Sequence, residues 1–253
     1  MRRCEGLTHH LPPAATAAYG RGMLLAEDIL LLLTEDQTGK AVVDTSTLEL
    51  ALAGAVLLEL ALAGRVDVAG PGEAVKPGRV VVRDASPAGD PLLDAALARI
   101  AGVSPRKPDS LLSTLKKGLV DEVRARLVHR GILRWEQGRV LGIFPTNRWP
   151  AEDSRHEDTV RRALFDVLVT GRTPTAVEAG IVSILLAVDK VHVVFPGTGL
   201  ARRELKARAK AISQGSFASE AVRKAIEAIN AAVMATIVAA TAAFLLACTL
   251  APG

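Results

Sequence analysis

The feature that most constrains this chain is an uncharged run of 24 residues, 228–251. A helix that crosses a bilayer needs about 20 predominantly apolar residues, so this run is long enough to span a membrane. Ten of its residues are alanine, however, and the strongly membrane-favouring Leu, Ile, Val and Phe are a minority. Small side chains on every side suit a helix that other helices approach closely in a core. We therefore expect a buried helix rather than a membrane anchor.

Length and composition favour one globular domain with a large core. Of the 253 residues, 49% are apolar, which excludes disorder as the dominant state. Residues 1–23 mix Pro, Gly, His and Ala without a period, so we predict a flexible leader before one domain over residues 24–253. Cys4 and Cys248 match no metal spacing and are not expected to pair, which favours a reducing, cytoplasmic setting.

The spacing of apolar residues and turn signals predicts a mainly helical fold with β-hairpin insertions. One hairpin is expected over residues 65–83 and another over residues 132–144, where strands 132–135 and 139–144 flank a Gly-containing turn. Residues 29–33 and 41–43 are expected to be short extended segments joined by a polar turn. The expected helices cover residues 48–63, 91–101, 111–130, 159–170, 175–188, 199–212 and 218–250.

A search for catalytic or metal-binding residues finds no recognisable site in the sequence. None of the histidines has a metal-binding spacing with a second His, Cys or carboxylate; they are His9, His10, His129, His156 and His192. Nucleophile-elbow, P-loop and dinucleotide-binding motifs are absent from the sequence. We therefore predict that the protein is not an enzyme and that it uses neither a metal nor another cofactor.

Basic residues gather in two parts of the chain, residues 99–139 and residues 201–224. In the first part, a single helix is expected to carry Lys116, Lys117, Arg124, Arg126 and Arg130. Positions 117 and 124 recur at near-heptad spacing on one side of that helix. The two tryptophans, Trp135 and Trp149, lie in or beside the second hairpin. Tryptophan beside lysine and arginine is typical of contact with an anionic membrane surface. The alternative interpretation is a solvated helix face and two core tryptophans.

Nucleic-acid binding is a competing interpretation of the same region. A basic helix followed by a two-stranded hairpin is the order of elements in a winged helix. A base-reading helix usually carries Arg, Asn or Gln near its exposed start, whereas residues 111–119 offer only Ser, Thr and Lys. Nucleic acid is therefore the less favoured partner.

Three segments of the sequence resemble the Golgi phosphoprotein 3 family and its bacterial relatives. They are LLELALAGRV at residues 57–66, DASPAGDPLLDAAL at residues 84–97 and VRARLVHRGIL at residues 123–133. The resemblance covers about residues 24–248, and it implies a mainly helical single domain around a long, buried, hydrophobic C-terminal helix. Members of this family are peripheral membrane proteins. The eukaryotic ones bind phosphatidylinositol 4-phosphate in a basic pocket, and some retain glycosyltransferases in the Golgi as adaptors.

The family's lipid pocket can be transferred to this sequence position by position. It combines a Trp, an Arg and two basic residues on a helix. By resemblance, the Trp position falls near Asp44 and the Arg position falls on Ala53. The two basic positions fall on Lys117 and Val120, with Lys116 beside the first. The resemblance therefore implies general attraction to anionic lipid more strongly than a pocket specific for one inositol phosphate.

These features predict a cytoplasmic, peripheral membrane protein without a transmembrane span. The predicted partners are anionic phospholipid headgroups, by resemblance phosphatidylinositol 4-phosphate, bound by Lys116, Lys117 and Arg124. We expect Arg148 and an exposed Trp149 to contact the membrane or a second copy of the chain. An adaptor for a protein partner is the alternative. The composition, rich in Ala, Val, Leu and Arg and poor in Lys, is typical of a GC-rich bacterial genome.

Overall fold

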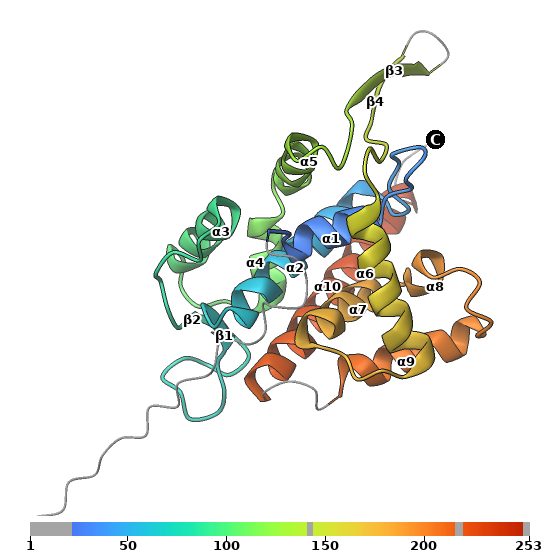
Figure 1. Cartoon of the computed structure of the whole chain (residues 1–253). Coiled ribbons are helices and arrows are strands. Elements are labelled where there is room, and N and C mark those ends of the chain that lie inside the picture. The colour runs from blue at the N-terminus through green and yellow to red at the C-terminus, as the bar shows by residue number, and fades with distance from the viewer. Residues whose placement is uncertain (1–21, 141–143, 216–219, 250–253) are drawn as a thin grey trace, which may run out of the picture.

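The computed structural model describes residues 22–140, 144–215 and 220–249, and the predicted leader lies outside them except for Gly22 and Met23. The strands are β1 (Val66–Val68), β2 (Val80–Val82), β3 (Glu136–Val140) and β4 (Phe144–Arg148). The helices are α1 (Leu25–Leu32), α2 (Thr45–Leu62), α3 (Pro91–Ala101), α4 (Pro108–Leu115), α5 (Leu119–His129), α6 (Arg155–Phe165), the π-helical segment η1 (Asp166–Thr170), α7 (Ala176–Ala187), α8 (Val191–Val194), α9 (Arg202–Ser213) and α10 (Glu220–Thr249). The predicted single, mainly helical domain with hairpin insertions is confirmed (Figure 1).

Helix α2 is the central helix of the core. Its N-cap is Asp44, whose carboxylate accepts a hydrogen bond from the backbone N–H of Thr47. From Thr47 onward almost every side chain of α2 is buried, since the helix is apolar on all sides and α1, α4, α5, α7 and α10 contact it. Figure 1 shows α1 and α2 crossing the middle of the molecule between α5 on one side and α6, α7 and α9 on the other.

The C-terminal helix, α10, is packed on one face and exposed on the other, so the prediction of a buried helix is wrong for its outer half. Ile226, Ile229 and Val233 are buried, whereas Met234 is 46% and Val238 is 65% exposed. By length and composition, both α2 and residues 222–242 of α10 could cross a membrane. The share of buried residues is 61% in α2 and 28% in the α10 segment, so α2 is the buried axis.

Two short segments differ from the sequence prediction because their apolar runs fit either helix or strand. Residues 29–33 were expected to be extended but lie mostly in α1, which the core encloses on all sides. Only an isolated bridge between Thr34 and Ala41 remains of the expected pair. In a short run that is buried all round, no periodicity separates helix from strand.

The second hairpin is shifted along the chain relative to the prediction. Strands β3 and β4 pair antiparallel, with Glu136 opposite Arg148 and Val140 opposite Phe144, whereas residues 132–135 precede the ladder. The hairpin projects away from the helices (Figure 1), so most of it has no face to bury against the domain. Without a buried face, the alternation of apolar residues does not specify the register. The first hairpin, β1 and β2, is confirmed, with Val66 opposite Val82.

The predicted helix over residues 111–130 is two helices. Lys116 caps the end of α4, and Gly118 has a φ of +75°, in the left-handed region, at the start of α5. Glycine takes this conformation without the steric cost of a Cβ atom, so it permits the change of direction between the helices. Lys117 and Arg124 therefore do not share one continuous helical face, as the sequence analysis had expected.

Candidate functional site

Lys116 and Lys117 form a basic turn between α4 and α5. Three buried leucines, Leu111, Leu112 and Leu115, anchor α4 and thereby fix the position of this turn. The Lys116 ammonium pairs with the Glu49 carboxylate of α2 at 3.2 Å. Lys117 is exposed and makes no ion pair with any residue that the structure describes. Of the two predicted lipid-binding lysines, Lys117 is therefore the one whose charge is fully available to an anion.

Arg124, the third predicted lipid-binding residue, is used inside the protein. Its guanidinium lies over the indole ring of Trp149, 3.9 Å from the ring centroid, in a cation–π contact. Burial lowers the pKa of Arg124, and the nearby Asp121 carboxylate acts in the opposite direction. The arginine thus joins α5 to the segment after β4, and it lies apart from the turn at Lys117.

Trp149 is half-buried and packs against the core, so the prediction of an exposed Trp149 is wrong. The backbone of Trp149 passes so close to Gly39, whose φ is +63°, that a Cβ atom there would overlap it. Ala151 also donates a backbone hydrogen bond to the carbonyl of Asp36 at 2.9 Å. These contacts fix the base of the hairpin to the loop after α1. Trp135, which precedes β3, is 53% exposed, and Arg148 of β4 is exposed as well.

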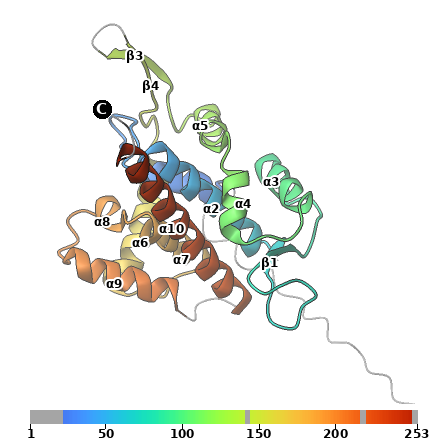
Figure 2. The ribbon, with the colours of Figure 1, turned by 180° about the vertical axis from the view of Figure 1, so that it is seen from behind.

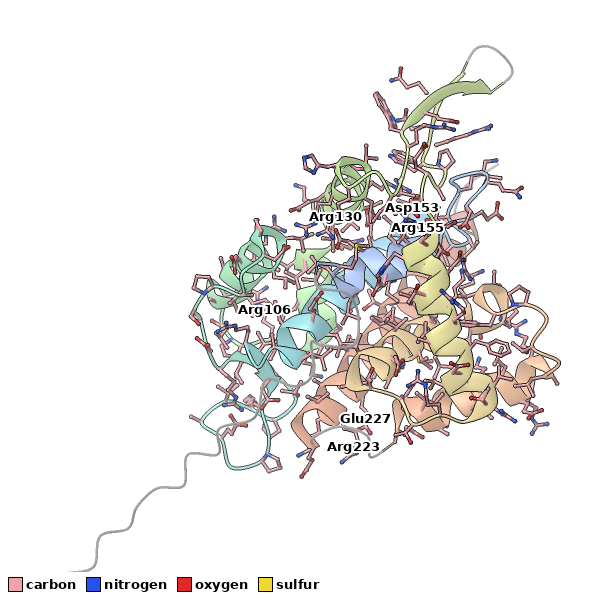
Figure 3. The ribbon with its side chains drawn as sticks, viewed as in Figure 1. Arg106, Arg130, Asp153, Arg155, Arg223 and Glu227 are labelled. Atoms are coloured by element: carbon pink, nitrogen blue, oxygen red, sulfur yellow. The ribbon has the colours of Figure 1, made fainter. Side chains whose placement is uncertain are left out.

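Arg126 of α5 and Arg130, which directly follows the helix, pair with acids that were not predicted to belong to a site. Glu27 of α1 is fully buried and pairs with Arg126 at 3.1 Å and with Arg130 at 3.6 Å. Arg126 also forms a bidentate pair with Asp90, the N-cap of α3, at 3.1 and 2.7 Å. Figure 3 shows Arg130 on the α5 side of α1. These arginines connect α1, α3 and α5, so they are not free for lipid or nucleic-acid phosphates.

Two further acids with raised pKa values, Glu59 and Asp28, lie beside this network. Burial raises the pKa of Glu59 to about 8, although its carboxylate accepts a hydrogen bond from the Leu25 N–H at 2.9 Å. Burial also raises the pKa of Asp28, whose carboxylate lies 2.6 Å from Nε2 of His156. The same hydrogen bond raises the pKa of His156. These groups are enclosed by α1, α2 and α6, and each has a partner, so the network joins helices.

The residues at the family's pocket positions do not form a basic pocket in this structure. Asp44 uses its carboxylate to cap α2, and hydrogen bonds from Thr47 lower its pKa. Ala53 is fully buried in α2, and Val120 is 7% exposed. An acid and two enclosed apolar residues cannot bind an inositol phosphate, so only Lys117 and Lys116 contribute positive charge there.

Metal binding has no grouped set of ligands in the described part of the chain. Over residues 22–140, 144–215 and 220–249, no three His, Cys, Asp or Glu side chains are grouped as metal ligands. A cavity of about 540 Å³ between η1 and α9 is bordered by Arg172 and Arg208. Arg208 donates to the carbonyl of Val169 at 2.8 Å and Arg172 donates to Glu178, so both stabilise the fold.

Comparison with known proteins agrees with this arrangement of elements. The sequence model described as Golgi phosphoprotein 3 (GPP34) matches residues 25–229, which is most of the chain. Vacuolar protein sorting-associated protein 74 of Eremothecium gossypii is 28% identical over 168 residues, which cover 58% of this chain. The chain spans about half (49%) of the length of that relative. The matched residues run from the start of α1 into the packed part of α10, and the chain belongs to the Golgi phosphoprotein 3 (GPP34) family.

Proposed function

We propose that this protein is a peripheral membrane protein that binds anionic lipid headgroups on the cytoplasmic face of a membrane. Membership of the Golgi phosphoprotein 3 family supports a membrane-associated role. The observation that carries the proposal is the basic turn at Lys116 and Lys117, where a rigidly held lysine is exposed without an acidic partner among the described residues. Each Lys or Arg near an anionic surface contributes about 1 kcal/mol to binding.

We infer that the attraction of the protein to a lipid depends more on the charge of the headgroup than on its shape. By family resemblance the ligand is phosphatidylinositol 4-phosphate. Only one of the family's pocket positions carries a basic side chain here, and Asp44 adds a negative charge at another. A phosphate would therefore meet lysine ammonium groups, which act as point charges, without the forked contacts of a bound arginine.

Vesicle sedimentation with the full chain tests this proposal. Neutral phosphatidylcholine vesicles should bind little protein. Vesicles containing phosphatidylserine should bind it, and binding should weaken as salt is raised. Vesicles with phosphatidylinositol 4-phosphate at the same total charge should bind about equally well. Strong preference for the phosphoinositide would reveal a specific pocket, and equal binding to neutral vesicles would refute the proposal.

A second candidate function is an adaptor that binds a protein partner. The observation that favours it is the projecting β3–β4 hairpin with the exposed Trp135 near its base. Tryptophan and arginine are enriched where proteins bind each other. Replacing Trp135 with Ala should leave vesicle binding unchanged if the hairpin serves a protein partner, and should weaken it if the hairpin meets the bilayer.

A further inference from the structure

One side of α10 exposes a row of apolar residues to water. Its residues recur at helical spacing and are all exposed: Ala231, Met234, Ala235, Val238, Ala239 and Ala242. We call them the α10 apolar face. The charges of α10 are confined to its start, where Lys224 pairs with Glu220 and Arg223 pairs with Glu227 (Figure 3). Beyond Glu227, the described part of the helix carries no charged residue, so the α10 apolar face exposes only apolar side chains to water.

Lysines border the α10 apolar face on the side of α9. Lys206 and Lys210 are one helical turn apart on α9, and both line a cavity of about 480 Å³ together with Ala231 and Met234 of α10. Lys206 pairs with Asp189 at 3.0 Å. Lys210 is exposed and has no ion-pair partner among the described residues. An available ammonium group therefore lies at this edge of the face.

The basic turn at Lys116 and Lys117 borders the other edge. Helices α2 and α10 run antiparallel, because the start of α10 contacts β1, which follows the end of α2, while Gly54 faces Ile229 and Val233. Glu49 precedes Gly54, so it lies level with the part of α10 that follows Val233. Lys116 is paired with Glu49 and is therefore level with the exposed part of α10. Figure 2 shows α10 crossing the molecule with α4 on one side and α9 on the other.

We propose that the α10 apolar face, with lysines at both edges, docks into the headgroup region of an anionic bilayer. Apolar side chains would enter the interface while Lys117 and Lys210 meet lipid phosphates, which is the arrangement of a membrane-surface helix. A second copy of the chain is a poorer occupant. Paired across a two-fold axis, two such faces would bring lysine-bearing edges together. This inference rests on the proposed lipid-binding function and identifies the surface that performs it.

A matched pair of Val→Asp variants tests the surface in the full chain. Val238→Asp places a charge on the α10 apolar face, and Val193→Asp places the same charge on α8 at another exposed valine. With phosphatidylserine vesicles, we expect Val238→Asp to lower the binding constant by about tenfold. Val193→Asp should lower it by less than about twofold, since it changes only the net charge. Equal effects of the two variants would overturn the proposed surface.

The outcomes separate this inference from the proposed function. If the parent chain binds anionic vesicles and Val238→Asp binds equally well, the function stands and the α10 surface is wrong. If the parent chain fails to bind them, both are wrong. Resistance of the membrane-bound chain to alkaline carbonate extraction would indicate a spanning helix and would also overturn docking on the surface.

A fluorescent reporter distinguishes the bilayer from a second copy. Val238→Cys, in a chain with Cys4→Ala and Cys248→Ala, is labelled with an environment-sensitive dye. Thr159→Cys on α6 serves as the control position. Docking predicts a blue shift at position 238 with anionic vesicles and none at position 159. A blue shift at position 238 that follows protein concentration without lipid would assign the face to self-association and overturn the proposal.

Discussion

Gly54 of α2 faces Val233 of α10 so closely that a Cβ atom added at Gly54 would lie 2.9 Å from Cγ2 of Val233. A glycine in the middle of a helix costs about 1 kcal/mol relative to alanine. At this position the missing side chain allows the two helices to approach each other. The contact joins α2 to α10, so substitutions at Gly54 or Val233 test how tightly these two helices must pack for the protein to be stable.

The first prediction concerns this contact. Gly54→Ala should destabilise the protein by about 1–3 kcal/mol despite its better helix propensity, because Val233 is branched and cannot move its Cγ2 away cheaply. Chemical denaturation measures the change. Val233→Ala should be less harmful in the Gly54→Ala background than alone, since the smaller side chain relieves the overlap. If the two changes in free energy of unfolding are additive, the helices move apart to accommodate the new methyl group and the prediction is wrong.

The second prediction separates the two sides of α10. Val233 is fully buried, so Val233→Asp should unfold the domain, because an unpaired charge in a core costs several kcal/mol. Val238 is 65% exposed, so Val238→Asp should change the free energy of unfolding by less than about 0.5 kcal/mol. Thermal melts followed by circular dichroism compare the two. If both variants unfold, Val238 is buried as well, and α10 is the fully buried helix that the sequence predicted.

The third prediction is a dependence of stability on pH through Glu59. Burial raises the pKa of its carboxyl from 4.5 to about 8. A raised pKa in the folded state means that Glu59 favours folding below about pH 4.5, and that this contribution disappears as the pH rises through about 8. Glu157, with a pKa raised by burial to about 7, acts in the same direction.

The test compares melting temperatures between these pH values. One pKa unit corresponds to about 1.4 kcal/mol, so the parent chain should lose on the order of a few kcal/mol as Glu59 ionises. Glu59→Gln keeps an acceptor for the Leu25 N–H and has no charge to ionise, so its melting temperature should fall less. Parallel curves for the parent and the variant would mean that Glu59 titrates normally.

The fourth prediction tests the basic turn. Replacing both Lys116 and Lys117 with Glu should lower binding to phosphatidylserine vesicles by about tenfold or more and reduce its salt dependence. The control is the double change Lys76→Glu and Arg99→Glu, at two exposed residues on other elements, which alters the net charge equally. The melting temperature of the control should stay close to that of the parent. That of the Lys116 and Lys117 variant should fall slightly, because Lys116→Glu places a second carboxylate beside Glu49. Equal loss of binding in both would indicate attraction without a defined site.

The fifth prediction concerns the two tryptophans. In a Trp149→Phe background, Trp135 should emit at long wavelength because it is exposed. In a Trp135→Phe background, the half-buried Trp149 should emit at shorter wavelength, and Arg124→Ala should shift that emission to longer wavelength by removing the stacked guanidinium. Loss of the cation–π contact should also cost about 0.5–2 kcal/mol of stability. Equal emission from both tryptophans would contradict the different burial of the two rings.

The sequence predicted the elements whose signals are local. Helix α3 begins with Pro91 in its first turn, and this signal placed it at its observed bounds. The predicted helix over residues 175–188 is also close to α7, whose capping box of Thr175 and Glu178 is a local signal of the same kind. The long reach of α10 was also predicted from its uncharged run. How much of α10 is covered depends on the number of helices around it, and no local pattern states that number.

The candidate site was only partly predictable, since its geometry depends on contacts between distant segments. Gly118 was visible as a glycine between Lys117 and Leu119, but glycine inside a helical pattern does not by itself announce a break. Arg126 looked like part of a basic face because its partner, Glu27, lies 99 residues earlier. Two acids within the apolar run of α1 were the available signal, because buried carboxylates require basic partners.

The packing of α10 on α2 also fixes the order in which the chain can fold during synthesis. Residues 48–60 of α2 emerge from the ribosome long before Ile226, Ile229 and Val233 of α10. Until those residues arrive, one side of α2 has no partner. The chain therefore completes its core only after α10 has been translated, and a nascent chain that stalls before α10 exposes a surface that favours aggregation.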